Sequence, residues 1–281
     1  AGGCPGRGAR RGRRGRAPPR HLTVSAACRR PVARSVVRPV VHWSLISAGL
    51  AGALFGAFLD LFPSAHPAAQ TTQPAGPPAA VYRVSFPEPE HHWMQVEAIF
   101  TTPERGPLDL HMSRSSPGRY AVSEFAKNVS SVEVFGARGE PLAFTRPDAD
   151  TWRVGAHAGT VRVVYRIFGD YANGTFFGVD TTHAHLNMPA AFMWAAGLDA
   201  QPIRITFTPP EGSRWRVGTQ LYPTTDPNTF TAPNLQYFMD SPTELSDFLT
   251  ATFAVPNAGG PASRFRLVVH GDSAQADVDA L

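Results

Sequence analysis

The stretch VRVVYRIF, residues 161–168, carries an apolar side chain at every second position, with arginines at two of the intervening ones. This alternation is typical of a β-strand with one face in the core, whereas a helix would space its apolar residues by three and four. The predicted core face consists of Val161, Val163, Tyr165 and Ile167. The stretch therefore predicts a strand in a sheet that exposes its other face.

The same pattern recurs along the chain in VYRVSF (81–86), WMQVEAIF (93–100), SVEVFG (131–136), IRITFT (203–208) and RFRLVVHG (264–271). In the second of these the core face would consist of Met94, Val96, Ala98 and Phe100, and in the fourth of Ile203, Ile205 and Phe207. Glycine- and proline-rich turn signals separate the stretches. Helical spacing is scarce, with short turns expected near 123–127 and 243–248. We predict an all-β, antiparallel β-sandwich-like domain with one or two short helical turns.

The charge of the chain is unevenly distributed. The 281 residues include 26 basic and 22 acidic ones, with a net charge of +4 and a pI of about 9.4. Eleven of the basic residues precede Val40, and the first acidic residue is Asp60. The remaining 15 basic residues face 22 acidic ones, a net charge of −7, which argues against a nucleic-acid-binding body.

Composition divides the chain into five segments. Residues 1–39 form an Arg/Gly/Pro-rich leader that is too poor in apolar residues to fold; it is either an RNA-binding arm or sequence upstream of the true start, and we favour the second. Residues 40–62 are the apolar core of a signal peptide or a membrane-anchor helix. A Pro/Ala-rich linker follows at 63–80, then the folded domain at 81–271 and a tail at 272–281.

The apolar segment predicts an exported protein, periplasmic or secreted, which would contact a membrane only through residues 40–62. Cys4 and Cys28 both precede this segment, so the exported part has no disulfide or catalytic thiolate. The zinc-peptidase motif His-Glu-x-x-His is absent. No spacing of serine, histidine and aspartate singles out a catalytic triad.

His183 and His185 are the residues best placed for a metal, because they would share one face of a strand. A third ligand would have to come from Glu88, Glu90, His91 or His92. Without a second anchored pair we prefer to interpret both histidines as hydrogen-bonded structural residues, and we predict no metal site in this chain.

The segment RSSPGRYAVSEFAKNV, residues 114–129, combines a Pro-Gly turn with a cluster of charges. A structural interpretation, in which the turn, an Arg119–Glu124 pair and backbone bonds from Asn128 lock a connection, is favoured over direct contact with a substrate. Its members are Pro117, Gly118, Arg119, Tyr120, Glu124, Lys127 and Asn128.

Four segments taken in order, YRVSF (82–86), SSPGRYAVSEFAKNV (115–129), HAHLN (183–187) and DSPTELSDF (240–248), resemble the N-terminal domain of the glycyl aminopeptidase family of gluzincin-type zinc metallopeptidases. The resemblance adds Asp240, Ser241 and Pro242 to the structural motif. It departs from the family at Ser115, where the family has tryptophan, and at Ser246, where it has glycine.

The resemblance implies a non-catalytic β domain that packs on a catalytic domain carrying the zinc and the His-Glu-x-x-His helix, followed by a PDZ domain. These parts have no counterpart here, so we expect this chain to be the front part of such an enzyme, inactive by itself and without a cofactor of its own. Peptide substrate would be met only in the complete enzyme, and nucleic acid is not an expected partner.

Glu244 is the candidate substrate-binding residue. A carboxylate on a domain edge that faces a catalytic cleft could bind the α-amino group of a peptide. Alternatively, Glu244 could start a helical turn and complement its dipole. The sequence leaves both roles open.

Seven apolar residues crowd into NLQYFMDSPTELSDFL, residues 234–249, and we expect part of this segment to be an exposed apolar patch beside Glu244 that meets the catalytic domain. The alternative function is a free-standing secreted β-sandwich that binds carbohydrate or protein. Its binding surface would be built from Trp93, Trp152, Trp194 and Trp215.

Overall fold

The computed structural model describes residues 76–103, 105–271 and 274–279. The predicted leader 1–39 and apolar segment 40–62 lie outside the described residues. Within the described ranges, no helix has both the length and the apolar character that crossing a bilayer requires.

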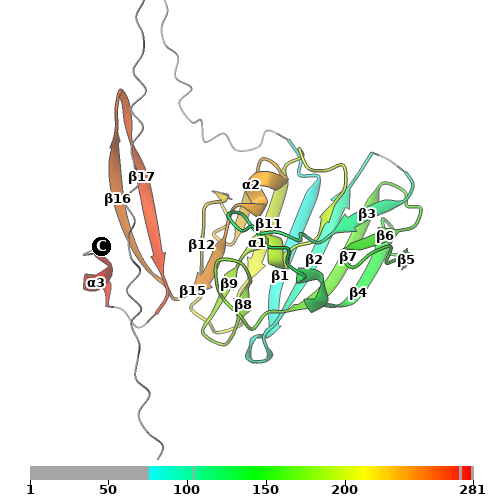
Figure 1. The fold of residues 1–281 in the computed structure, drawn as a ribbon, viewed down its shortest axis with the longest axis horizontal. Coiled ribbons are helices and arrows are strands. Elements are labelled where there is room, and N and C mark those ends of the chain that lie inside the picture. The colour runs from blue at the N-terminus through cyan, green and yellow to red at the C-terminus, as the bar shows by residue number, and fades with distance from the viewer. Residues whose placement is uncertain (1–75, 104, 272–273, 280–281) are drawn as a thin grey trace, which may run out of the picture. The chain divides into compact units, whose positions relative to one another are not determined.

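A seven-stranded sheet forms one layer of the domain, in the order β13-β14-β11-β1-β2-β7-β4 (Figure 1). Its strands are β1 (Ala80–Glu88), β2 (Trp93–Thr101), β4 (Val129–Gly136), β7 (Thr160–Phe168), β11 (Ile203–Thr208), β13 (Tyr222–Pro223) and β14 (Thr229–Ala232). All neighbours are antiparallel except β1 and β11, which run parallel. The prediction of an all-β fold is confirmed. The predicted antiparallel pairing has one exception in this sheet, the parallel pair β1 and β11, which is possible because a long connection separates these two strands in the sequence.

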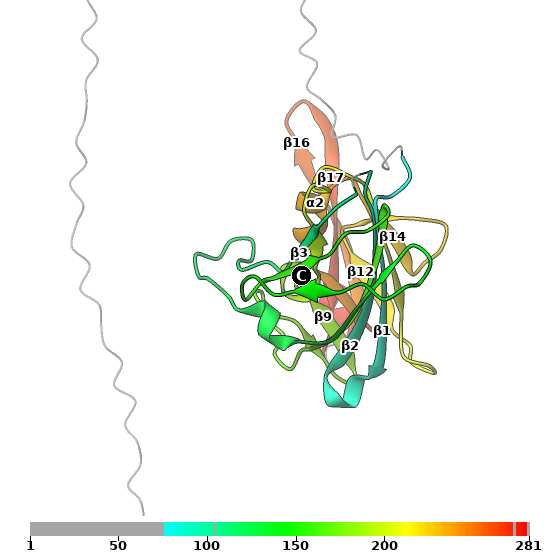
Figure 2. The same ribbon diagram turned by 90° about the vertical axis from the view of Figure 1, so that its right-hand side faces the viewer.

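Two four-stranded sheets complete the sandwich-like arrangement, ordered β10-β3-β6-β5 and β12-β15-β9-β8. The first contains β3 (Leu108–His111), β5 (Phe144–Thr145), β6 (Thr151–Val154) and β10 (Trp194–Ala195). The second contains β8 (Gly178–Val179), β9 (His183–Leu186), β12 (Arg216–Thr219) and β15 (Thr243–Ser246). In Figure 2, β3 and β9 lie on the same side of β1 and β2.

The remaining elements are short. They are η1 (Pro89–His91), η2 (Phe125–Asn128), α1 (Met188–Ala191), α2 (Leu235–Met239), α3 (Gln275–Asp279) and a hairpin of β16 (Leu249–Asn257) and β17 (Gly260–Val269). Within the described chain the hairpin strands pair only with each other. The helical turn expected near 123–127 is confirmed by η2.

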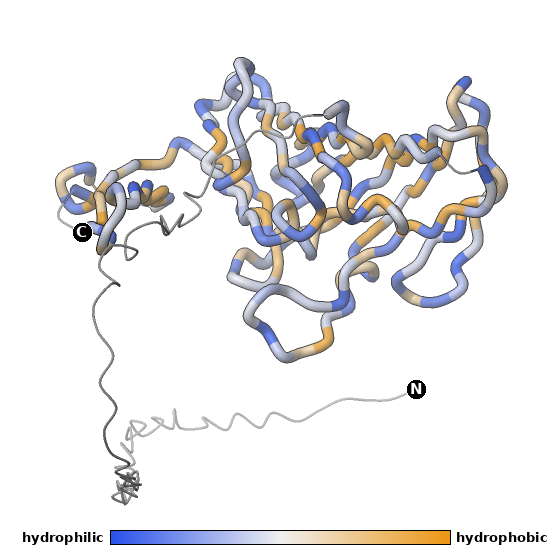
Figure 3. Tube along the Cα trace, turned by 90° about the horizontal axis from the view of Figure 1, so that it is seen from above, coloured by the Kyte–Doolittle hydropathy of each residue, from blue (hydrophilic) through white to orange (hydrophobic). Residues whose placement is uncertain are grey.

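The predicted alternation of buried and exposed residues is present along the central strands. All the core-face residues predicted for 93–100, 161–168 and 203–208 are buried, and Figure 3 shows hydropathy changing from residue to residue along much of the chain. On the other face, Glu97 pairs with Arg83 at 2.9 Å and with Arg162 at 3.3 Å. The period of two therefore separates an apolar core from a charged surface.

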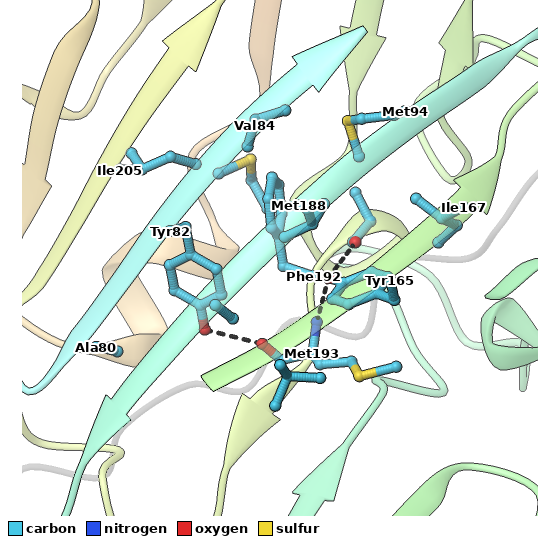
Figure 4. Packing of buried hydrophobic residues seen from close by; sticks show 14 of the residues in the cluster. Ala80, Tyr82, Val84, Met94, Tyr165, Ile167, Met188, Phe192, Met193 and Ile205 are labelled. Atoms are coloured by element: carbon cyan, nitrogen blue, oxygen red, sulfur yellow. Dashed lines mark hydrogen bonds between the residues drawn. The ribbon is translucent and has the colours of Figure 1, made fainter. Parts of the chain in front are cut away.

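Two buried tyrosines connect the large sheet to the segment around α1 (Figure 4). The Tyr82 hydroxyl donates to the Met193 carbonyl at 2.8 Å. The Tyr165 hydroxyl donates to the Ala191 carbonyl at 3.0 Å and accepts from the Met193 N–H at 3.1 Å. Burial raises the pKa of both hydroxyls, so they stay neutral donors. Since α1 follows β9 after a single residue, these bonds also hold β9 in place.

The helical turn predicted for 243–248 is wrong. Residues 243–246 form strand β15, and the helix of this region is α2, which ends before Ser241 and Pro242. The residues of TELS alternate in direction, and Thr243 and Leu245 are buried. Pairing with β9 and β12 provides the hydrogen bonds that a helical turn would otherwise make locally.

The exposed apolar patch expected in 234–249 is also wrong. Its seven apolar side chains, Leu235, Tyr237, Phe238, Met239, Leu245, Phe248 and Leu249, are all buried or half-buried. They fit because α2 packs into the core, where Phe238 stacks on Tyr82 with ring centroids 5.0 Å apart. The large apolar side chains that are exposed lie elsewhere among the described residues, at Tyr120, Val122 and Tyr171 and, on the hairpin, at Phe253, Val255 and Phe265.

The tryptophans of the alternative function do not form an exposed surface. Trp152 and Trp215 are buried, and Trp93 and Trp194 are half-buried. Arg166 lies over the Trp93 ring at 4.8 Å, and the Trp194 ring lies 4.8 Å from that of His111. These rings serve packing rather than capture of a ligand.

We expect Tyr165→Phe to reduce the free energy of unfolding by about 1–3 kcal/mol, because it leaves the Met193 N–H without this partner in the core. Tyr120→Phe is the matched control; Tyr120 is fully exposed, and its change should stay within about 0.5 kcal/mol. Urea unfolding measures both. Equal effects of the two substitutions would contradict the role given to Tyr165.

Candidate functional site

The site is built on the outer face of the paired strands β9 and β15. Along β9, Ala184 and Leu186 are buried, so His183 and His185 share the opposite face, as predicted. The register places Glu244 directly opposite His185. His185 Nδ1 lies 3.2 Å from Glu244 Oε2.

Glu244 lies in the middle of a strand and not at a helix start, so its interpretation as a dipole-complementing carboxylate is wrong. Its side chain is only 14% exposed. One carboxylate oxygen contacts His185, whereas Oε1 is buried and has no hydrogen-bond partner among the described residues. Because an unpaired buried acceptor costs about 1–3 kcal/mol, this oxygen is suited to a donor from outside the chain.

Three hollows meet at the His185–Glu244 pair. One, of about 530 Å³, is lined by both residues together with His183, His270 and the loop 172–174. A second, of about 290 Å³, is reached by His185 from the other side. A third, of about 540 Å³, lies between Glu244 and strand β17. His185 thus lines all three hollows, whereas Glu244 lines the first and the third, so a ligand in either of these two would lie beside the pair.

The Pro-Gly turn borders the second hollow. The Arg119 N–H donates to the Ser116 carbonyl at 3.1 Å, and Gly118 has a φ of 74°, which glycine adopts without strain. Asn187 Nδ2 donates to Ser116 Oγ at 2.9 Å and also to the Thr175 carbonyl. Asn187, which sequence reasoning did not single out as a site residue, thus fixes this loop beside β9.

The DSP segment reaches the same hollow and positions Glu244. Ser241 is buried, and its hydroxyl donates to the Tyr237 carbonyl at 2.5 Å. Gln220 Nε2 donates to the Asp240 carbonyl at 2.5 Å and to Ser241 Oγ at 3.2 Å. Asp240 and Pro242 line the hollow with Ser116, Pro117, His185 and Asn187. Three of the segments singled out from the sequence therefore converge at one place.

Other residues of the predicted motif lie apart from the site. Among the described ion pairs none joins Arg119 to Glu124; instead Arg114 pairs with Asp150 at 2.9 Å. Tyr120 is fully exposed. Lys127 and Asn128 end the η2 turn, where the Lys127 N–H donates to the Glu124 carbonyl at 3.2 Å.

The histidines have partners of their own. His183 Nδ1 lies 3.0 Å from Thr182 Oγ1 and 3.3 Å from Asp180 Oδ1, and its ring stacks on His270 at 4.3 Å. In the described ranges, no three His, Cys, Asp or Glu side chains are grouped so as to hold a metal ion. Of the suggested third ligands, Glu88 pairs with Arg166 and His92 contacts the Val179 carbonyl.

Asp180 organises the turn that leads into β9. Burial alone would raise the pKa of Asp180, but hydrogen bonds from the Thr182 hydroxyl and from the N–H groups of Thr182 and His183 outweigh it and lower this pKa to about 2. The ionised carboxylate therefore fixes the position where His183 begins the strand.

A further hollow, of about 590 Å³, lies away from this site and is lined in part by Asp109 and Arg153. These two side chains bind each other through two contacts of 2.7 and 2.8 Å. Because Asp109 and Arg153 already bind each other, their charged groups are less available to a ligand than the unpaired oxygen of Glu244.

Comparisons with known proteins agree with this fold. Residues 81–247 match the family model described as Peptidase M61 N-terminal domain. None of the curated proteins matches the sequence. The fold is similar to an aminopeptidase N family protein from Idiomarina loihiensis, with a TM-score of 0.62 and 17% identity over 72% of this chain and 34% of that one.

Two other solved structures are more distant. The M1 zinc metallopeptidase from Deinococcus radiodurans has a TM-score of 0.38 and 10% identity over 67% of this chain and 46% of its own. Legionella pneumophila aminopeptidase A, solved with aspartic acid, has a TM-score of 0.42 and 8% identity over 68% and 23%. The chain therefore spans less than half the length of each of these proteins, and the likeness concerns the fold.

We expect Asp180→Asn to weaken the acid sensitivity of the fold. The folded-state pKa of about 2 lies below the unfolded value of about 3.9, so ionised Asp180 stabilises the fold above about pH 4 and loses this effect as the pH falls through 2. Between pH 4 and 2 the free energy of unfolding should fall less in the variant than in the wild type. The difference is expected to be small, since the side chain is 41% exposed. Chemical denaturation at several pH values measures the free energy of unfolding of both proteins. An equal fall in the two proteins between pH 4 and 2 would contradict the prediction.

Proposed function

The chain belongs to the Peptidase M61 N-terminal domain family, and we propose that its folded part is the non-catalytic β domain of an exported zinc aminopeptidase of the glycyl aminopeptidase type. In this role it packs on a catalytic domain and helps to shape the substrate cleft. In the proposed enzyme the zinc belongs to the catalytic domain, which the resemblance places before a PDZ domain.

The observation that carries the cleft role is the unpaired Oε1 of Glu244. An aminopeptidase recognises the free α-ammonium group of its substrate, which offers three N–H donors and a positive charge. Glu244 offers a buried acceptor with negative charge, beside hollows large enough for a peptide. A hydrogen bond between charged groups in such a place contributes about 1.5–3 kcal/mol.

The surroundings of Glu244 suit an anchor that must not move. Its backbone is paired on both sides, with β9 and with β12. His185 contacts its other oxygen and leaves Oε1 as the acceptor for the ligand. The strand that carries the acceptor is thus already in place before binding, which limits the conformational entropy that binding costs.

The hairpin supports the proposal of a packed neighbour. Phe253 and Phe265 stack across the two strands at 5.2 Å, and each is 47% exposed. A two-stranded hairpin is only marginally stable by itself, and exposed stacked rings favour contact with another apolar surface. In the proposed enzyme the catalytic domain provides that surface.

Export is proposed from the sequence. Within the apolar segment 40–62, the uncharged run of residues 40–59 follows four arginines, and small residues and prolines come after the segment, which is the organisation of a signal peptide or anchor. The folded part would then act in the periplasm or outside the cell.

We expect Glu244→Gln to weaken binding of Ala-Ala-Ala-amide to the full chain by about 10–150-fold, which corresponds to the 1.5–3 kcal/mol of the charged contact. N-acetyl-Ala-Ala-Ala-amide should not bind measurably to either protein, because it has no ammonium group. Isothermal titration or chemical-shift mapping measures the affinities.

Glu211→Gln serves as the control, since Glu211 is an exposed carboxylate on the turn after β11 and should leave the affinity unchanged. If the acetylated and free peptides bind alike, or if Glu244→Gln binds as well as the wild type, Glu244 is not an α-amino anchor.

We also expect the full chain to hydrolyse no aminoacyl substrate when stoichiometric zinc is added, because zinc hydrolysis needs a grouped ligand set and a general base. A panel of aminoacyl amides read by amine release checks this. Zinc-dependent turnover that disappears in His183→Ala or His185→Ala would instead assign a metalloenzyme centre to β9.

A further inference from the structure

The hollow between Glu244 and strand β17 carries charges of both signs. On one side it is lined by Glu244 and His185, and along its floor by Gly218, Thr219 and Gln220. On the other side it is lined by Arg264 and Arg266. A site with an anion at one end and two cations at the other is complementary to a ligand that carries the opposite charges.

Strand β17 is fixed against β12 at the base of this hollow. A Cβ on Gly218 would lie 2.9 Å from Val268, so only glycine lets the two strands approach this closely. Arg266 Nη2 donates to the Thr219 carbonyl at 3.2 Å. Arg216 adds a bond from its guanidinium to the Phe248 carbonyl, at the start of the hairpin. Contacts at several residues therefore set the position of β17 relative to Glu244.

The arginines face the hollow because of the strand period. Residues 264, 266 and 268 lie on the same face of β17, and Val268 of this set packs on Gly218. Gly218 in turn stands opposite Glu244 in the β12–β15 register. With about 3.3 Å per residue, Arg266 is about 7 Å along the strand from Val268, and Arg264 about 7 Å further.

Both guanidinium groups have capacity left for an anion. No described carboxylate pairs with either arginine, and Arg266 uses only part of its five N–H donors on Thr219. Arginine binds a carboxylate through two parallel hydrogen bonds, which fixes direction as well as charge. Glu244, at the other end, is engaged by His185 and lacks a partner only at Oε1.

We propose that this hollow binds a peptide whose free α-amino group contacts Glu244 and whose carboxylate, one residue further along, contacts Arg266 and Arg264. The inference rests on the proposed function of Glu244 and adds a substrate class to it. In an extended peptide the α-nitrogen and a side-chain carboxylate on the second residue lie roughly 6–9 Å apart, about two residues of strand length. This separation is close to the step of about 7 Å along β17 from Val268, which packs on Gly218, to Arg266. The same chemistry is provided by an acidic second side chain or by the terminal carboxylate of a dipeptide.

The test measures affinities of the full chain for matched peptides at low salt. Ala-Asp-Ala-amide is compared with its neutral analogue Ala-Asn-Ala-amide, and Ala-Ala with Ala-Ala-amide. We expect a gain of tenfold or more for at least one carboxylate member of these pairs. A gain in the first pair identifies the side chain as the source, and a gain in the second identifies the chain terminus. The gain should shrink at high salt.

Arg264→Gln with Arg266→Gln should abolish that gain, so that Ala-Asp-Ala-amide binds no better than Ala-Asn-Ala-amide to the double variant. Arg138→Gln, at an exposed turn, should change neither affinity. Circular dichroism confirms that the variants fold. If neither pair shows a gain, or if the gain survives in the double variant, the inference is wrong.

Acetylated Ala-Asp-Ala-amide separates this inference from the proposed function. If free peptides bind better than acetylated ones while carboxylates give no gain, Glu244 keeps its role and only the arginine site is wrong. If the acetylated acidic peptide binds as well as the free one, Glu244 is not an α-amino anchor, and the proposed site that combines Glu244 with the two arginines is wrong as well.

Discussion

The hydroxyl of Tyr165 joins the large sheet to the segment that follows β9. It bonds to both the Ala191 carbonyl and the Met193 N–H, in a region where no solvent reaches. The segment around α1 is thereby attached to strand β7 of the large sheet. Because this segment continues directly from β9, the orientation of the sheet that carries His185 and Glu244 depends on bonds made on the far side of the core. Packing and the polar site are thus parts of the same arrangement.

The polar site follows from the same period of two that builds the core. Ala184, Leu186, Thr243 and Leu245 point inward, so their neighbours His185 and Glu244 must point outward, where they meet across the register. Oε2 of the Glu244 carboxylate contacts His185, whereas Oε1 has no hydrogen-bond partner among the described residues. A structural carboxylate is normally bonded at both oxygens when it is buried. The unsatisfied half is therefore the feature that most distinguishes a binding role from a structural one.

The hairpin gives the site its second wall. The family match ends at residue 247, and β16 begins two residues later. One face of the hairpin carries the stacked Phe253 and Phe265, and the other carries Arg264 and Arg266. The two faces suit different neighbours, an apolar surface on one side and an anionic group on the other. A single element can in this way join a domain contact to the recognition of a ligand.

The sequence by itself determined the long strands of the large sheet, their buried faces and the family. Period-two alternation is a local property, and Met94, Val163 and Ile205 are buried where that alternation put them. It also identified HAHLN, the Pro-Gly turn and DSPTEL as notable, but it could not show that they adjoin. Adjacency depends on strand order, which is decided by long-range pairing and by burial.

Only the tertiary structure decided that Glu244 lies in a strand. TELS has no strong local preference, and pairing with β9 and β12 outweighs the turn that Ser-Pro suggested. It also decided that the seven apolar side chains of 234–249 are buried or half-buried, because α2 packs beside Tyr82, and that Phe253, Val255 and Phe265 of the following hairpin are exposed. Gly218 and Arg266 carry no signal of a site in the sequence, and HAHLN does not reveal what its Asn187 contacts, since each of these residues acts through a partner distant along the chain whose position only the folded state defines.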